Sequence, residues 1–219
     1  MWHNVVQGSP EWLALRRGRF TGSKVHELIV KKAWNGDCDN LLTKGGKTYV
    51  RKSLCLSEQN TYESDAMIRG SQLEPHARLR FELQHNIKVQ NTGFYAYENW
   101  LGFSSDGLTF EDNGRKGVAE IKCPLEQKHL LYCTCRTWQD VLKVSPLLCW
   151  EMCLPLLLLP KLDVCWFVSY YPEYIGTERS HLALFALCLE RNNNLLTILA
   201  DSLIRAKIYR DGLVKKLGL

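Results

Sequence analysis

The amino-acid sequence predicts one α/β domain over residues 1–219. Apolar side chains recur every three to four positions near both ends of the chain, a spacing typical of helices. From residue 87 to 110 the apolar period falls to two, and apolar runs at 117–122 and 165–171 indicate further strands. The sequence has no internal repeat, low-complexity tract or clear linker, so a second domain is not predicted.

The composition is that of an ordinary globular protein. Hydrophobic residues make up 46% of the chain, and the net charge of +5 permits a polyanionic partner without requiring one. Pro155 and Pro160 interrupt the longest apolar run, so no membrane contact is expected. The first residues lack a charged region followed by an apolar core, so we expect an intracellular protein, in the cytoplasm or nucleus, without a signal peptide.

The nine cysteines show no paired Cys-x-x-Cys spacing, and their number is odd. Without a signal peptide, they are interpreted as reduced thiols that act as small core residues. The sharper alternative is a zinc site at His129, Cys133 and Cys135, although the paired spacing of a structural site is missing. An iron–sulfur site ranks last, because the late cysteine cluster that it needs is absent from the sequence.

Near the N-terminus, Ser9 is expected to cap a helix whose first position is Pro10. Trp12 and Arg16 then share one face of this helix, with Arg19 a turn further on. Such a face beside a core tryptophan is also consistent with a solvated basic surface.

Ser23 is expected to cap a second helix that runs through Val25, Leu28 and Ile29. Guanidinium groups from Arg16, Arg17 and Arg19, the Ser23 hydroxyl and free backbone N–H groups would together form a phosphate pocket.

Residues 34–48 are expected to form a loop, followed by a short helix over 49–56. Pro75 fits only a first helical turn, so a helix is predicted to begin there with Glu74 at its start. Glu74 would satisfy backbone donors at this helix start or serve as a further metal-site acid. The predicted buried stripe of this helix consists of Leu73, Ala77, Phe81 and Gln84.

The central pattern is Asp106, a polar turn over residues 111–114, and then Glu120-Ile121-Lys122. Two apolar runs joined by such a turn predict a β-hairpin or two neighbouring strands. Glu120 and Lys122 then point the same way, with Ile121 in the opposite layer, and Asp106 can reach the same point. Two carboxylates beside one lysine are typical of a hydrolase that uses a divalent metal, whereas the alternative is a surface ion pair.

After the hairpin, residues 126–143 read as helical, and Pro146 opens another helix that Pro155 should kink or end near Glu151. Residues 165–171 are a predicted strand, with 181–189 as its partner. A turn at 192–194 precedes a final amphipathic helix over 195–217. The solvent face of this helix is expected to carry Arg205, Lys207, Arg210, Lys215 and Lys216.

In combination, these blocks resemble the YqaJ-type viral recombinase nucleases, relatives of phage lambda exonuclease within the PD-(D/E)XK superfamily. The resemblance extends over roughly residues 8–190. It rests on the order of five blocks: Trp12-x-x-x-Arg16, Thr21-Gly22-Ser23, Gly70-x-x-x-Glu74, Ser105-Asp106-Gly107-Leu108 and Glu120-Ile121-Lys122-Cys123-Pro124.

The resemblance implies a central mixed β-sheet flanked by helices, a restriction-endonuclease-like core. It also implies 5′→3′ digestion of one strand of duplex DNA that carries a 5′-phosphate end, with Mg²⁺ or alternatively Mn²⁺ as cofactor. A homotrimer around the DNA and a single-strand annealing protein are the partners that it suggests.

The resemblance further implies roles for individual residues. Asp106, Glu120 and the backbone carbonyl of Ile121 would bind the metal, with Glu74 as an additional acid. Lys122 would position the attacking water or help to deprotonate it. Arg16 and Ser23 would hold the terminal 5′-phosphate, with Trp12 supporting that helix.

One segment departs from the family pattern. Family members usually carry a glutamine on the helix after the catalytic strands, whereas the corresponding segment here reads Cys149-Trp150-Glu151-Met152-Cys153. Glu151 places a carboxylate where an amide is expected, and a carboxylate would bind metal or repel the scissile phosphate. The alternatives to an exonuclease are therefore an endonuclease of the same fold and a catalytically weakened module that binds DNA ends.

Overall fold

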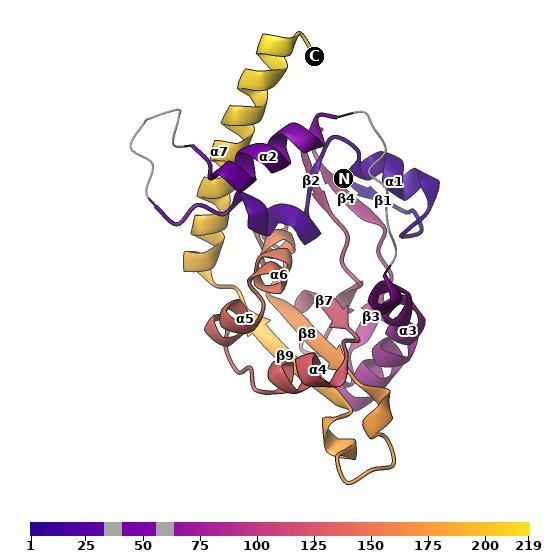
Figure 1. Cartoon of the computed structure of the whole chain (residues 1–219). Helices are drawn as coiled ribbons and strands as arrows, with labels where there is room; N and C mark the ends of the chain where they lie inside the picture. Colours follow the sequence, from indigo (N-terminus) through magenta and orange to yellow (C-terminus); the bar gives the residue numbers. More distant parts are fainter. Residues whose placement is uncertain (33–40, 56–63) are drawn as a thin grey trace.

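The larger of two β-sheets is mixed and has the strand order β3-β6-β7-β8-β9 (Figure 1). The computed structural model describes residues 1–32, 41–55 and 64–219. Strands β7 and β8 run parallel, and the other neighbours pair antiparallel. The strands are β3 (Lys88–Gln90), β6 (Gly107–Phe110), β7 (Lys116–Lys122), β8 (Val164–Tyr170) and β9 (Leu184–Glu190).

The smaller sheet has the order β1-β4-β5-β2 and gathers the N-terminus with part of the middle of the chain. The segment with period two is therefore divided between two sheets, because β3 pairs with β6 whereas β4 pairs with β5. At Gly102 a Cβ atom would lie 2.4 Å from the Phe94 ring, so only glycine permits this close approach. The strands are β1 (Trp2–His3), β2 (Phe20–Thr21), β4 (Phe94–Tyr97) and β5 (Leu101–Phe103).

Helices cover both faces of the larger sheet (Figure 1). On strand β8, Val168 packs with Ala77 and Phe81 of α3, whereas its neighbour Phe167 belongs to the apolar cluster that includes α6. The helices are α1 (Pro10–Arg16), α2 (Lys44–Ser53), α3 (Asp65–His85), α4 (Glu126–Cys133), α5 (Trp138–Val144), α6 (Pro146–Leu158) and α7 (Asn193–Leu217), with 3₁₀ helices η1 (Gly22–Leu28), η3 (Pro172–Tyr174) and η4 (Ser180–Leu182). The predicted α/β fold with a central mixed sheet flanked by helices is thus confirmed.

Helix α3 begins ten residues before the predicted start. Ser64 caps its N-terminus by accepting a hydrogen bond from the N–H of Met67, and Pro75 lies inside the helix. The proline removes one backbone donor, but its ring lies on the exposed side and packing of the opposite face holds the helix together. Glu74 therefore lies in mid-helix, and Gln84 is exposed instead of belonging to the buried stripe.

Pro155 was expected to kink or end the helix near Glu151; helix α6 continues through Pro155 to Leu158, so the proline does not end it. The segment after Glu151 is almost wholly buried between η1, α7 and the larger sheet, and this burial outweighs the lost hydrogen bond. The predicted helix over 126–143 is instead two helices, because Thr137 starts α5 with a capping box to Asp140.

The remaining differences concern helix starts and one arginine. Ser23 lies inside the 3₁₀ helix η1, whose N-cap is Thr21, and α2 begins within the predicted loop at Lys44. The rest of that loop, residues 34–40, and Leu56 lie outside the described part of the chain. Arg205 is buried and paired with Asp201, because its place on α7 turns it toward the core instead of solvent.

The segment 192–194 starts a helix instead of forming a separate turn. Asn192 caps α7 through its side-chain oxygen, which accepts the N–H of Leu195. Among the described residues, no helix is both long and apolar enough to cross a membrane.

Candidate active site

The β6–β7 hairpin brings Asp106 beside the end of β7. The strands pair antiparallel with Gly107 opposite Ala119, and the Asp106 N–H donates to the Ala119 carbonyl at 3.1 Å. The Ile121 N–H donates to Oδ2 of Asp106 at 2.6 Å. The carboxylate is thus held by the backbone of the strand that carries Glu120 and Lys122.

Glu120 and Lys122 lie on one face of β7 and form an ion pair with Nζ 2.5 Å from Oε1. Glu151 reaches the same ammonium from α6, with its Oε2 at 3.3 Å. Ile121 points to the other layer, where it packs with Phe81 of α3. Glu120 is only 6% exposed and the Lys122 side chain is 33% exposed, so the pair is partly buried and differs from the surface ion pair of the alternative interpretation.

Arg78 connects Glu74 to Asp106, and the sequence interpretation missed it. Its Nη2 donates to Oε1 of Glu74 at 2.9 Å and to the backbone carbonyl of Asp106. Its other terminal nitrogen donates to the side-chain oxygen of Asn91. The i,i+4 spacing from Glu74 could have indicated this ion pair, but only with both residues inside one helix.

Four carboxylates lie in and around this site, those of Glu74, Asp106, Glu120 and Glu151. The positive charge beside them does not fully offset their negative charge. Burial raises the pKa of Asp106 to about 7; Lys122 opposes the shift, and the charges of Glu74 and Glu151 add to it. Burial likewise raises the pKa of Glu120 well above its usual value, against the attraction of Lys122. Burial disfavours the charged ammonium of Lys122, but the surrounding carboxylates outweigh this effect and raise its pKa.

This donor set fits a hard divalent cation. Carboxylate oxygens are the ligands that Mg²⁺ and Mn²⁺ prefer, and a bound cation would offset the crowding that raises the pKa values of Asp106 and Glu120. Across residues 1–32, 41–55 and 64–219, no group of three His, Cys, Asp or Glu side chains is placed to hold one ion. Two carboxylates and a backbone carbonyl therefore remain the predicted ligand set.

A second polar cluster surrounds Arg16. Its Nη2 lies 3.3 Å from Oγ of Ser23 and 3.5 Å from Oγ1 of Thr21, and its guanidinium lies 4.1 Å from the centre of the Trp12 ring. Tyr49 of α2 closes the cluster, since its hydroxyl oxygen accepts the N–H of Thr21 at 3.1 Å. The structure thus brings Arg16, Ser23 and Trp12 together.

The Arg16 cluster is connected to the carboxylates through two contacts. Nε1 of Trp12 donates to Oγ of Ser104 at 2.7 Å, two residues before Asp106. A Cβ atom at Gly22, between Thr21 and Ser23, would lie 3.7 Å from Cγ of Glu151, so Glu151 adjoins the Arg16 cluster as well as Lys122. Burial lowers the pKa of Arg16, and the charges of Tyr49 and Glu151 partly restore it.

Arg19 lies outside this cluster. Helix α1 ends at Arg16, and Arg19 donates instead to the backbone carbonyls of Leu15 at 2.6 Å and Glu98 at 3.4 Å. The expected face shared by Trp12, Arg16 and Arg19 is therefore limited to the first two residues.

At the residues of the zinc alternative, the structure shows a buried histidine whose ring nitrogens already have hydrogen-bond partners. His129 is fully buried, and its ring nitrogens lie 2.8 Å from Oγ of Ser169 and 2.7 Å from the carbonyl of Leu182. Cys133 lies 3.5 Å from the same ring, and Cys135 is directed at the carbonyl of Leu131. These contacts are those of a packed core.

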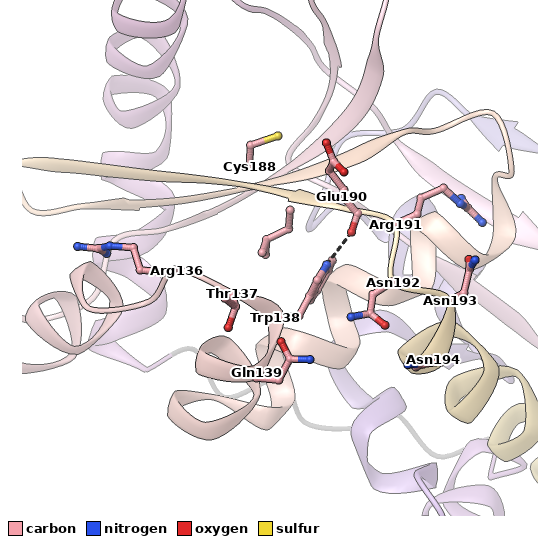
Figure 2. A pocket seen from close by; sticks show the side chains of 11 residues that line it. Arg136, Thr137, Trp138, Gln139, Cys188, Glu190, Arg191, Asn192, Asn193 and Asn194 are labelled. Carbon is pink, nitrogen blue, oxygen red and sulfur yellow. Dashed lines mark hydrogen bonds between the residues drawn. The ribbon is translucent and has the colours of Figure 1, made fainter.

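A pocket of about 460 Å³ lies away from these clusters, where the end of β9 meets the starts of α5 and α7 (Figure 2). Trp138 crosses it and donates from Nε1 to the carbonyl of Glu190 at 2.7 Å (Figure 2). Its guanidinium groups are already engaged, since Arg136 and Arg191 donate to backbone carbonyls. None of the predicted site residues lines this pocket.

The family can now be assigned. The model of the YqaJ-like viral recombinase domain matches residues 11–142, which include Trp12, Arg16, Asp106, Glu120 and Lys122. The chain belongs to this family. Beyond the matched range, the YqaJ-like chain continues through Glu151 on α6 and the long helix α7.

Solved structures show that the fold of this YqaJ-like chain is that of phage-type exonucleases, with a PD-(D/E)XK-like core. An alkaline exonuclease (LHK-Exo) from Laribacter hongkongensis is similar with a TM-score of 0.66 and 23% identity, over 96% of this chain and 98% of that one. Its complex with dAMP gives 0.65 and 25%, with the same coverage. A phage-related exonuclease from Haemophilus somnus 129PT gives 0.66 and 16%, over 94% and 99%. A search of curated proteins found no significant match.

Proposed function

We propose that the chain is a metal-dependent DNA exonuclease that digests linear duplex DNA from a 5′-phosphorylated end, in recombination or end processing. The observation that carries this proposal is the convergence of Asp106, Glu120 and Lys122, next to the separate Arg16–Ser23 cluster. Membership of a recombinase family and the likeness to exonucleases, one of them solved with dAMP, support it. We propose that residues 1–219 act as one nuclease domain.

Asp106, Glu120 and the carbonyl of Ile121 would hold Mg²⁺, or alternatively Mn²⁺. When bound, the ion would lower the pKa of a water molecule and neutralise phosphate oxygens. Lys122 places its ammonium at the same carboxylates, where it can orient the nucleophile and stabilise the extra negative charge. Glu74 contributes a further acid, and Arg78 fixes it relative to Asp106.

Arg16 and Ser23 would grip the terminal 5′-phosphate. A half-buried guanidinium beside a hydroxyl offers several donors to a phosphate, and the Trp12 ring keeps this guanidinium in place. By analogy with the family, we further propose a homotrimer as the active form and a single-strand annealing protein as the recipient of the product strand.

A second candidate is a module that binds DNA ends but cleaves weakly. The observation that favours it is the ion pair between Glu151 and Lys122, at 3.3 Å. A carboxylate at this place repels a scissile phosphate and engages the ammonium that catalysis needs. Binding of linear ends without release of nucleotides, in Mg²⁺ or Mn²⁺, would favour this candidate.

Digestion of three DNA substrates tests the proposal. With Mg²⁺, linear duplex bearing a 5′-phosphate should be digested fastest, unphosphorylated linear duplex more slowly, and closed circular duplex should survive. Lys122→Ala should reduce the rate at least about a hundredfold, because charge stabilisation of this kind contributes about 10²–10³ in rate. Cleavage of the circle at a rate like that of the linear form would instead identify an endonuclease.

A further inference from the structure

Positive charge is concentrated in three segments, whose helices η1, α2 and α7 pack on one another. Residues 1–32, 41–55 and 193–219 together contain 15 lysines and arginines against 4 aspartates and glutamates. Residues 64–192 contain 13 basic and 15 acidic residues. Although the net charge of the whole chain is mild, these three segments are strongly basic. Surfaces of this kind attract polyanions.

Helix α2 shows this asymmetry most clearly. It carries four basic residues and no acidic residue, and its buried side consists of Gly46, Tyr49, Val50 and Ser53. Lys44, Arg51 and Lys52 are exposed, and we refer to these three residues as the basic α2 face. Within the described part of the chain, no carboxylate lies in ion-pair distance of these three side chains, so their positive charges are not offset by a neighbouring acid.

The surroundings extend the basic α2 face. The backbone at Gly18 lies next to the carbonyl of Ser53, which brings the exposed Arg17 close to the end of α2. On the other side α2 packs on α7, whose C-terminal end projects beyond the rest of the chain and exposes Lys215 and Lys216 (Figure 1).

Helix α2 also borders the Arg16 cluster directly. Tyr49, on its buried side, accepts a hydrogen bond from Thr21, which contacts Arg16. At 1.5 Å per residue, the basic α2 face extends over about 12 Å. One strand of B-DNA carries a charge about every 3.4 Å along the helix axis, so this length matches about three phosphates.

We propose that the basic α2 face binds the sugar–phosphate backbone of the DNA duplex next to the end that Arg16 and Ser23 hold. This inference rests on the proposed function and extends it. The Arg16 cluster recognises one terminal group, whereas the basic α2 face binds several internal phosphates without regard to sequence. The salt dependence of duplex binding should therefore arise in large part from the basic α2 face.

The test compares two triple variants with equal changes of charge. Lys44→Gln, Arg51→Gln and Lys52→Gln remove the basic α2 face. Lys88→Gln, Lys116→Gln and Lys161→Gln remove three exposed charges from the other half and serve as the control. Glutamine preserves helix propensity, and thermal unfolding checks that both variants fold.

Binding to a 5′-phosphorylated duplex of about 30 base pairs is followed by fluorescence anisotropy in EDTA, from about 50 to 200 mM salt. Three lost phosphate contacts predict that the slope of log K against log salt falls in magnitude by about 2–3, and that Kd rises by about ten- to a hundredfold near physiological salt. The control variant should keep the wild-type slope.

An unchanged slope in the α2 variant, or an equal change in the control, overturns the proposal. So does unchanged duplex binding together with lost binding to vesicles of anionic lipid, which would assign the surface to a membrane. Tighter binding of single strands through the same residues overturns the choice of duplex. Because EDTA prevents cleavage, these outcomes are independent of the digestion assay, whose failure would instead reject the nuclease function.

Discussion

Glu151 shares the ammonium of Lys122 with Glu120. Its carboxylate faces Lys122 at 3.3 Å, and its Cγ would lie 3.7 Å from a Cβ atom at Gly22, next to Ser23, so it lies between the two halves of the proposed site. A negative charge in this position opposes the approach of a phosphate that both cations should attract. We therefore expect Glu151 to limit the rate of the proposed reaction.

Replacement of Glu151 by Gln should increase activity. The amide keeps the shape of the side chain and removes the repulsion, so we expect kcat/KM for 5′-phosphorylated duplex to rise by about fivefold or more, equivalent to about 1 kcal/mol. Glu178→Gln, at an exposed position beyond η3, is the control and should behave as wild type. A loss as large as that of Lys122→Ala would instead show that Glu151 takes part in catalysis.

Asp106 predicts an unusual pH dependence. Its pKa in the folded protein is about 7, mainly because the carboxyl is buried, and lies above the ordinary value of 3.8. The folded state thus binds a proton that the unfolded state releases between these two values. The contribution to stability is fully present below about pH 4 and is lost as the pH rises through 7.

Metal binding should reverse this loss, because Mg²⁺ requires the ionised carboxylate. We expect the metal-free protein to melt at a lower temperature at pH 8 than at pH 5, relative to Asp106→Asn, which does not titrate. Mg²⁺ should raise the melting temperature more at pH 8 than at pH 6. If Mg²⁺ stabilises Asp106→Asn as much as it stabilises the wild type at both pH values, Asp106 is not a ligand.

At the scale of elements, local sequence patterns predicted strand β7, which carries Glu120 and Lys122, but not the start of helix α3 beside it. The hairpin from Asp106 to Lys122 follows from alternation and a polar turn, both of which are local. The start of α3 at Asp65 contradicts the rule for Pro75, because burial of Ala77 and Phe81 against the sheet stabilises the whole helix. Tertiary packing of this kind has no signature within a short window of sequence.

The proline in α3 provides a test at this scale. Pro75→Ala would restore a donor to the Ser71 carbonyl at an exposed position, so we expect unfolding in urea to cost about 1–3 kcal/mol more. His76→Ala, at the next exposed position, should change stability by less than about 0.5 kcal/mol. Equal or lower stability of Pro75→Ala would mean that the proline fits the native backbone without strain.

At the scale of the molecule, the site depends on contacts between distant parts of the chain. Trp12 bonds to Ser104, and β2 pairs with β5 in parallel, so the N-terminal segment is fixed beside the strand that leads to Asp106. The residue types of both clusters could be predicted from sequence spacing. Their connection, and the separation of Arg19 from Arg16, could not, because they depend on how the two sheets are joined.

This separation allows a sharp test of how the DNA end is held. Arg16→Ala removes a half-buried guanidinium beside Ser23, so digestion should no longer distinguish linear duplex with a 5′-phosphate from duplex without one. The loss should fall on the phosphorylated substrate, by about ten- to a hundredfold in kcat/KM, as expected for one or two charge-assisted hydrogen bonds. Rates on both substrates, measured side by side, give the preference directly.

Arg19→Ala is the matched control. It removes the same charge three residues further along the chain, and the side chain that it removes donates to backbone carbonyls. Its preference for the phosphorylated end should equal that of the wild type, even if its stability falls. A preference that survives Arg16→Ala but disappears in Arg19→Ala would move the phosphate pocket to the other side of α1. Loss of the preference only in Arg16→Ala would place recognition of the DNA end and the cleavage chemistry on two segments joined through Trp12 and Ser104.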